Sequence, residues 1–383
     1  MCLITQLLLT TCISPFTPQG FEGKGGTIVI EGDIILQGET RVYVSLSGVL
    51  DRDFSVNYIM DAQVFVLNND GEKFMGVIRT NEYPPFYTIN TRALRFDKEY
   101  KLCVYLSDGT QYESDFIAPL ITPEMETIEF EVNDSQTAVD FLVTTYGEDP
   151  LQNSSRYYKW RYTEDWEFTS FYRTNYYFDP IIGSVVPYNS DPLFYYCWKK
   201  DVSTSILVAK TDHLEQNNVI QQKVNTIDYK DDRISYLYSM ELAQMSISKE
   251  AYLYWSTLRK NTEEIGGIFA PQPSEMFGNI HCVSDPAYKA YGYISAGIVS
   301  YKRIIVSKEE MDIYVPTPCP FFDPTTFLSP IGAPLTDKDK HDFGLLVVKY
   351  SSDDPVEWAS PNCVDCRKKG TKEKPAYWPN SDL

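Results

Sequence analysis

The sequence predicts a mainly β protein, with a small β-sandwich followed by a larger, mostly-β domain that holds one principal helix. Aromatic residues make up 14% of the chain and include 29 Tyr, and such side chains pack well on the pleated faces of strands. Short apolar runs alternate with turn residues along the first third of the sequence. Only one segment has strong signals for a long helix.

The first domain is predicted at residues 27–122, after a Pro-, Gly- and Thr-rich stretch at 12–26 that is typical of a flexible tether. Asp-Gly pairs at 70–71 and 108–109 follow apolar runs, and Gly accepts the positive φ that a hairpin turn requires. Short strands at this spacing predict a sandwich of roughly 100 residues. The strand-like runs are 27–30, 41–46, 62–67 and 101–106.

A larger, mostly-β domain is predicted at residues 127–350, and a Cys-containing C-terminal tail at 351–383. Its principal helix is expected to begin after Ser248, whose side chain can cap the first turn, and Glu250 suits the positive end of the helix dipole. Strand-like runs in this domain are 128–132, 205–208, 234–238 and 303–306.

Residues 1–11 are predicted to be a lipoprotein signal peptide. A short apolar run ends in Leu-Thr-Thr directly before Cys12, and the run is shorter than the ~20 apolar residues that span a bilayer. We therefore expect Cys12 to be lipidated after cleavage and to hold the mature chain on a membrane. The alternative is an ordinary N-terminal segment in which a cysteine occurs by chance.

The charge of the chain bears on its partners. Its net charge is −19 at pH 7, so the phosphate backbone of a nucleic acid would repel it. No nucleic-acid partner is expected, and the excess negative charge is most simply a means of staying soluble.

The eight cysteines suit an exported protein, because disulfides form outside the cytoplasm. Cys363 and Cys366 form a C-x-x-C pair, for which a structural disulfide is favoured over free thiols; a zinc or redox site is least favoured, because no second C-x-x-C is present. Such a bridge would shape the terminal loop so that Tyr377 and Trp378 can dock. The other disulfide candidates are Cys282 and Cys319.

No metal or other cofactor is predicted. The three His lie far apart in the sequence, and the adjacent side chains of His281 and Cys282 would point to opposite faces of a strand. No short catalytic motif occurs either, so the chain is not expected to be an enzyme.

A dense aromatic segment at 157–178 is the candidate for ligand binding. It could be a platform for sugars or for another ligand with an apolar face, but core packing is the favoured interpretation, because aromatic side chains dominate β-domain cores. Adjacent aromatic pairs on a strand would still place one ring outward. The binding candidates are Tyr158, Trp160, Trp166, Tyr172 and Tyr177.

Several short pieces, taken in order along the chain, resemble the Bacteroidota outer-membrane lipoproteins grouped as domain of unknown function 4249 (DUF4249). Each piece alone is a weak signal, whereas the series covers most of the sequence. The pieces are the lipobox at Cys12 and residues 29–34, 44–47, 108–114, 252–255, 261, 266–269, 273, 278–280, 292–296, 363–366, 370–371, 374–375 and 377–378.

The resemblance implies an immunoglobulin-like fold for 27–122, lipid anchoring at the outer membrane and a TonB-dependent receptor as partner. It supplies no catalytic residue. The expected function is that of a non-enzymatic envelope lipoprotein that captures a ligand or assists TonB-dependent transport. Alternatives are a glycan-active envelope enzyme, which needs two facing carboxylates, and a structural adhesion module. Because Glu22 is the first acidic residue after Cys12, the leaflet that the protein occupies stays open.

Overall fold

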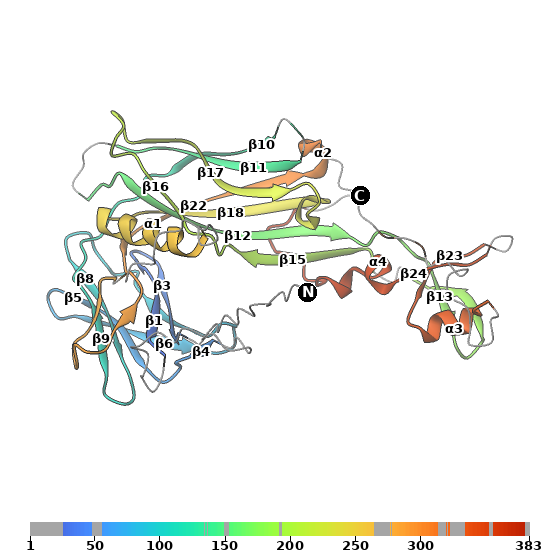
Figure 1. The fold of residues 1–383 in the computed structure, drawn as a ribbon, viewed down its shortest axis with the longest axis horizontal. Coiled ribbons are helices and arrows are strands. Elements are labelled where there is room, and N and C mark those ends of the chain that lie inside the picture. Colours follow the sequence, from blue (N-terminus) through green and yellow to red (C-terminus); the bar gives the residue numbers. More distant parts are fainter. Residues whose placement is uncertain are drawn as a thin grey trace, which may run out of the picture.

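The computed structural model confirms that the protein is mainly β, with 47% of residues in strands and 11% in helices. It describes residues 26–47, 56–133, 135, 137–148, 153–190, 194–263, 276, 278–312, 319, 321, 334–351 and 355–379. The molecule is elongated, and we call its parts the N-terminal, central and distal units (Figure 1). No helix among the described residues is long and apolar enough to cross a membrane.

The N-terminal unit is a sheet of ten strands that runs in the order β19-β9-β8-β5-β6-β7-β3-β1-β20, with β4 beside β3. The predicted hairpin turns are confirmed: Gly71 joins β5 to β6 at a φ of 89°, and Gly109 joins β8 to β9 at a φ of 91°. The strands are β1 (Ile28–Gly32), β3 (Glu39–Leu46), β4 (Asn57–Tyr58), β5 (Gln63–Asn68), β6 (Lys73–Arg79), β7 (Phe86–Asn90), β8 (Tyr100–Tyr105), β9 (Gln111–Ser114), β19 (Ile280–Cys282) and β20 (Ala290–Tyr291).

This unit is not one continuous stretch of sequence, unlike the predicted domain 27–122. β19 pairs with β9, and β20 pairs in parallel with β1. A further short strand, β21 (Ala296–Gly297), pairs with β2 (Ile34–Ile35). Residues 280–291 thus supply the strands that hydrogen-bond to the outer edges of β9 and β1. Since the strands form one connected sheet, the immunoglobulin-like description of this unit is not confirmed.

The central unit packs a three-stranded sheet against a five-stranded sheet (Figure 1). Large side chains from both sheets fill the space between them, among them Phe141, Trp160 and Tyr238, none more than 1% exposed. The first sheet has β10 (Met125–Val132), β11 (Ala138–Tyr146) and β17 (Asn218–Asp228); the second has β15 (Tyr196–Val202), β12 (Tyr157–Thr169), β18 (Leu237–Ser246), β22 (Val299–Ser307) and β16 (Leu207–Lys210).

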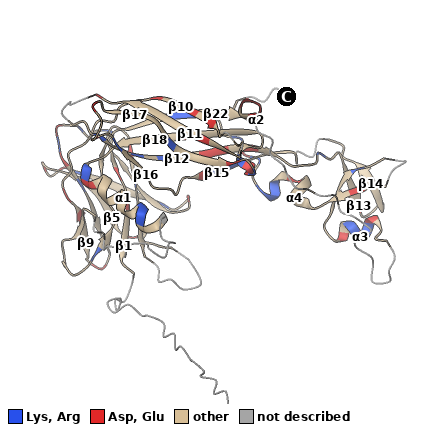
Figure 2. Ribbon diagram, turned by 45° about the horizontal axis from the view of Figure 1, so that its top comes forward, with Lys and Arg blue, Asp and Glu red and all other residues tan. Residues whose placement is uncertain are grey.

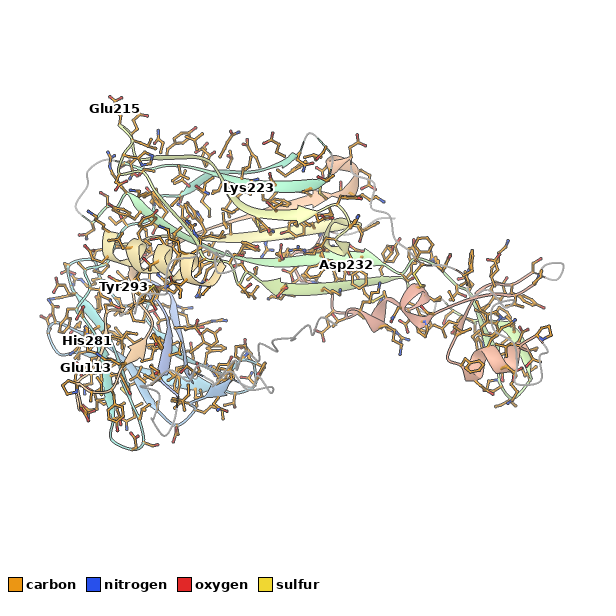
Figure 3. The ribbon with its side chains drawn as sticks, viewed as in Figure 1. Glu113, Glu215, Lys223, Asp232, His281 and Tyr293 are labelled. Atoms are coloured by element: carbon orange, nitrogen blue, oxygen red, sulfur yellow. A yellow bond between two sulfur atoms is a disulfide. The ribbon has the colours of Figure 1, made fainter. Side chains whose placement is uncertain are left out.

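The principal helix, α1 (Lys249–Glu263), lies where the N-terminal and central units meet (Figure 1). The predicted cap is confirmed, because the backbone N–H of Ala251 donates to Ser248 Oγ at 3.1 Å. Ala251 is fully buried in a cluster that also receives Ile35 from the N-terminal unit. Tyr293 lies beneath the helix (Figure 3), and its hydroxyl is 3.4 Å from Ser248 Oγ.

The distal unit projects from the far end of the central sheets (Figure 1). Its small core holds Phe178, Val347 and Trp358. The predicted boundary between residues 350 and 351 falls inside a hairpin of this unit. Its elements are β13 (Tyr176–Asp179), β14 (Ser184–Pro187), α3 (Asp337–Asp342), β23 (Leu346–Lys349), β24 (Glu357–Ala359) and α4 (Pro361–Val364), and a 3-10 turn at Cys366–Lys368 follows.

Candidate functional site

A cavity of about 780 Å³ opens between the N-terminal and central units, and we call it the junction groove. Its floor is the outer face of β12, β18 and β22, and one wall is the chain from β2 into β3. Side chains of both units therefore face the same space. The wall includes Gln37, Glu39, Arg41 and Tyr43, and the floor includes Arg161, Thr163, Glu241, Ala243 and Tyr301.

The register of three strands sets the shape of the floor. Arg161 of β12 pairs with Ala243 of β18, and Ala243 pairs with Tyr301 of β22. Directly paired residues share one face of a sheet, and neighbouring strands lie about 4.8 Å apart. The methyl group of Ala243 therefore leaves an open space roughly 10 Å wide, between a guanidinium and a phenol ring.

A buried ion pair closes one end of the groove. Lys159 Nζ lies 2.6 Å from Asp33 Oδ2, with the two side chains 8% and 10% exposed. Asp33 Oδ1 also accepts from the N–H of Ser295 at 3.2 Å, and the ammonium lies 4.8 Å from the centre of the Trp255 ring. Burial lowers the pKa of Lys159, whereas Asp33 acts in the opposite direction. The pair ties the N-terminal unit to the central sheet.

The other charged residues of the groove differ in how they are neutralised. Glu39 pairs with Arg41 at 3.1 Å, and Glu241 pairs with Arg303 at 2.9 Å. Arg161 is exposed and has no ion pair or hydrogen bond to its side chain among the described residues. The groove therefore offers one guanidinium that no carboxylate satisfies.

Three of the five binding candidates do not form a binding face, and core packing, the favoured interpretation, is confirmed for them. Tyr158, Trp160 and Trp166 are 0%, 1% and 6% exposed and belong to the core between the central sheets. Even-numbered residues of β12 face that core, so the rings that the sequence places close together fill the interior. The Trp160 indole N–H donates to Gln244 at 2.9 Å, and the Tyr158 hydroxyl donates to Asn217 at 3.0 Å.

The remaining two candidates, Tyr172 and Tyr177, are half-buried and lie away from the groove. The Tyr172 ring stacks on Phe321 with centroids 4.6 Å apart, and its hydroxyl donates to the Cys319 carbonyl at 2.7 Å. The Tyr177 ring lies 4.7 Å from that of Tyr188. The structure does not bring the five candidates together.

The far end of the same β12 face is acidic and is covered by the C-terminal segment 366–379. β12 carries basic residues in its first half and acidic residues in its second (Figure 2). The Tyr377 hydroxyl donates to Asp165, and the Trp378 indole N–H donates to Glu167 at 2.7 Å. Burial raises the pKa of Glu167, although the bond from Trp378 opposes this. The expected docking of Tyr377 and Trp378 is thus observed.

The disulfide prediction is wrong in its pairing. Cys366 bonds to Cys197 of β15, and Cys363 bonds to Cys319, whereas Cys282 is a buried free thiol. Cys363 lies in α4 and Cys366 in the 3-10 turn that follows, and the extended Asp365 between them directs the two side chains to different neighbours. Adjacency in sequence does not bring the two sulfur atoms together.

The side chains of His281 and Cys282 point to opposite faces of a strand, as predicted. His281 is exposed and Cys282 is buried on β19, and His281 pairs with Glu113 of β9, beside which it is seen in Figure 3. Among the described residues, no group of three or more His, Cys, Asp or Glu side chains could hold a metal ion. Cys12 lies outside the described residues.

Sequence reasoning did not single out the groove. Of the residues that line it, only Trp160 was a binding candidate, and its side chain belongs to the core. The charge of Arg161 is visible in the sequence. The small Ala243 beside it and Tyr301 opposite it come from two other strands, so the sequence does not show that they lie near Arg161. The period of β12 is the only available signal, because it separates odd-numbered outer residues from even-numbered core residues.

Comparison with known families identifies a match over most of the chain. A family model described as "Domain of unknown function (DUF4249)" matches residues 13–303. This range includes every residue that lines the junction groove. No curated protein matches the chain.

Proposed function

The chain belongs to the DUF4249 family, and from that premise we propose that it is a non-enzymatic, lipid-anchored protein of the cell envelope. In this role it captures a ligand for a TonB-dependent outer-membrane transport system, or completes such a system as an accessory component. The observation that carries the proposal is the junction groove, which is built jointly by two units and is lined by side chains of mixed chemistry.

The size and position of the groove suit ligand capture. Small-molecule pockets typically have volumes of about 300–1,000 Å³ and are common where two units meet. The cavity of about 780 Å³ lies within that range and at such a junction. The buried Lys159–Asp33 pair holds its two sides together, so the site is formed before a ligand arrives.

The carboxylates of the groove favour binding over acid–base catalysis. Asp33 and Glu241 each lie within 3 Å of a cation, at 2.6 Å from Lys159 and 2.9 Å from Arg303. Both carboxylates are therefore already engaged in ion pairs within the protein, whereas a glycosidase needs two carboxylates that face the substrate from either side of the scissile bond. This arrangement supports the non-enzymatic reading of the groove.

Support for the anchor comes from the sequence. Residues 1–11 have the apolar pattern of a signal peptide and lead directly to Cys12. The segment 12–26 is long enough to act as a tether before β1 begins at Ile28. Acyl chains on Cys12 would then hold the folded units close to a membrane without a spanning helix.

Cell fractionation and affinity purification test this proposal. The full chain, tagged after residue 383, is expressed in its native host, and detergent-solubilised membranes are purified through the tag. We expect the wild type in the outer membrane, together with a TonB-dependent receptor that stays bound through washing. Cys12→Ser should release the chain or leave it unprocessed, whereas Cys103→Ser, at a buried free thiol, should not. A wild-type protein that is soluble, or that retains no receptor after cross-linking, contradicts the proposal.

A further inference from the structure

The unsatisfied guanidinium of Arg161 is the most informative group in the junction groove. In a protein with a net charge of −19, the neighbouring cations Lys159 and Arg41 are each matched by a carboxylate. Arg161 has no such partner among the described residues, and its charge reaches far enough to lower the pKa of Lys159. A guanidinium presents a planar fork of donors that fits a carboxylate or a phosphate.

The rest of the lining distinguishes between these two anions. Glu39 and Glu241 also line the groove, and both would repel a phosphate monoester, which carries a charge of about −1.5 to −2 at neutral pH. A single carboxylate is repelled less. The same two side chains, with Thr163, can accept hydrogen bonds from ligand hydroxyls. The groove therefore suits a singly charged ring that carries several hydroxyl groups.

The junction groove also offers aromatic rings to a ligand. Tyr301 is 63% exposed and lies across the open floor from Arg161, with only Ala243 between them. Tyr43 contributes a second ring from the wall. Exposed tyrosine rings provide a flat apolar face with a polar tip, which matches the C–H face and the hydroxyl edge of a pyranose.

We propose that the junction groove binds a short oligosaccharide that carries a single uronic acid, with the carboxylate held by Arg161 and a sugar ring stacked on Tyr301. This inference rests on the proposed ligand-capturing function and names the class of ligand. The space of roughly 10 Å over Ala243 accommodates the ring between the two side chains.

Titration calorimetry on the full chain in detergent, at low salt, tests the inference with cellobiouronic acid, a disaccharide that carries one carboxylate, as the probe. We expect Arg161→Gln to weaken binding by about 10- to 100-fold, which is the usual effect of losing a charge-assisted hydrogen bond. Arg161→Lys should fall in between, because it keeps the charge and loses the fork. Tyr301→Ala and Ala243→Phe should also weaken binding, by removing the ring and by filling the floor.

A matched control is Arg79→Gln on β6, an exposed arginine outside the groove, which should leave affinity within about two-fold. Circular dichroism checks that each variant is folded. The inference is overturned if cellobiouronic acid does not bind, if the neutral disaccharide cellobiose binds equally well, or if inorganic phosphate competes at equal concentration. Membrane location and receptor retention need no sugar, so they are scored separately: their loss refutes the proposed function, and failure of uronate binding alone refutes only the ligand class.

Discussion

Removal of the Cys197–Cys366 disulfide tests the organisation of the C-terminal region most directly. This bridge joins residues 169 positions apart, and the Cys319–Cys363 bridge joins residues 44 positions apart. In the chain-entropy model, such closures stabilise a fold by about 5 and about 4 kcal/mol. A bridge between Cys363 and Cys366 would close a far shorter loop, worth roughly 2 kcal/mol. The pairing therefore decides how much stability the cysteines contribute.

The double variant Cys197→Ala with Cys366→Ala should lower the free energy of unfolding by up to about 5 kcal/mol. Alanine avoids placing new hydroxyls where both sulfur atoms are buried, at 0% and 1% residue exposure. The docking of Trp378 on Glu167 is not covalent, so the segment should still pack in the native state. The loss then arises in the unfolded chain, which gains freedom.

Guanidinium chloride unfolding without reductant measures the effect, and Cys103→Ala with Cys282→Ala is the matched control, since it removes two buried free thiols and no bridge. Peptide mapping without reduction should link the peptide that contains Cys197 to the one that contains Cys366. A peptide bridged between Cys363 and Cys366, or a loss of stability no larger than that of the control, would refute the reasoning.

Three further predictions follow from the buried charges and the sheet order. Lys159→Met should lower the free energy of unfolding in urea by roughly 3–5 kcal/mol, because it leaves the buried Asp33 without its cation. Adding Asp33→Asn should restore most of this stability, and a double variant as unstable as Lys159→Met would show that the unpaired Asp33 does not cause the loss. Burial raises the pKa of Glu167 above its usual 4.5, so the folded state binds a proton more tightly than the unfolded state, and stability should fall as the pH rises from 4.5 through the raised pKa. Glu167→Gln should make the denaturant midpoint fall less steeply with pH over this range. If the midpoint falls as steeply as in the wild type, Glu167 is not the group responsible. Residues 26–122 alone should not unfold cooperatively, because β1 and β9 lose their partners from residues 280–291, and a sharp thermal transition of this fragment would contradict that expectation.

Local features of the fold could be predicted because their causes lie within a few residues. An Asp-Gly pair can form a tight turn only where the chain tolerates a positive φ, and both predicted turns are present at Gly71 and Gly109. Ser248 caps α1 through a bond to a residue three positions away. The mainly β character follows in the same way from the abundance of aromatic residues, which pack well on strands.

The sequence alone therefore determined the fold class, the turns, the helix cap and the family, whereas the tertiary structure decided which distant segments meet. Arg161 and Tyr301 face each other only because β18 pairs with both of their strands. Cys366 meets Cys197, and not its neighbour Cys363, because Asp365 is extended and the 3-10 turn packs on β15. Such contacts depend on which faces and edges the whole chain must bury or pair, and no short window of sequence contains that information.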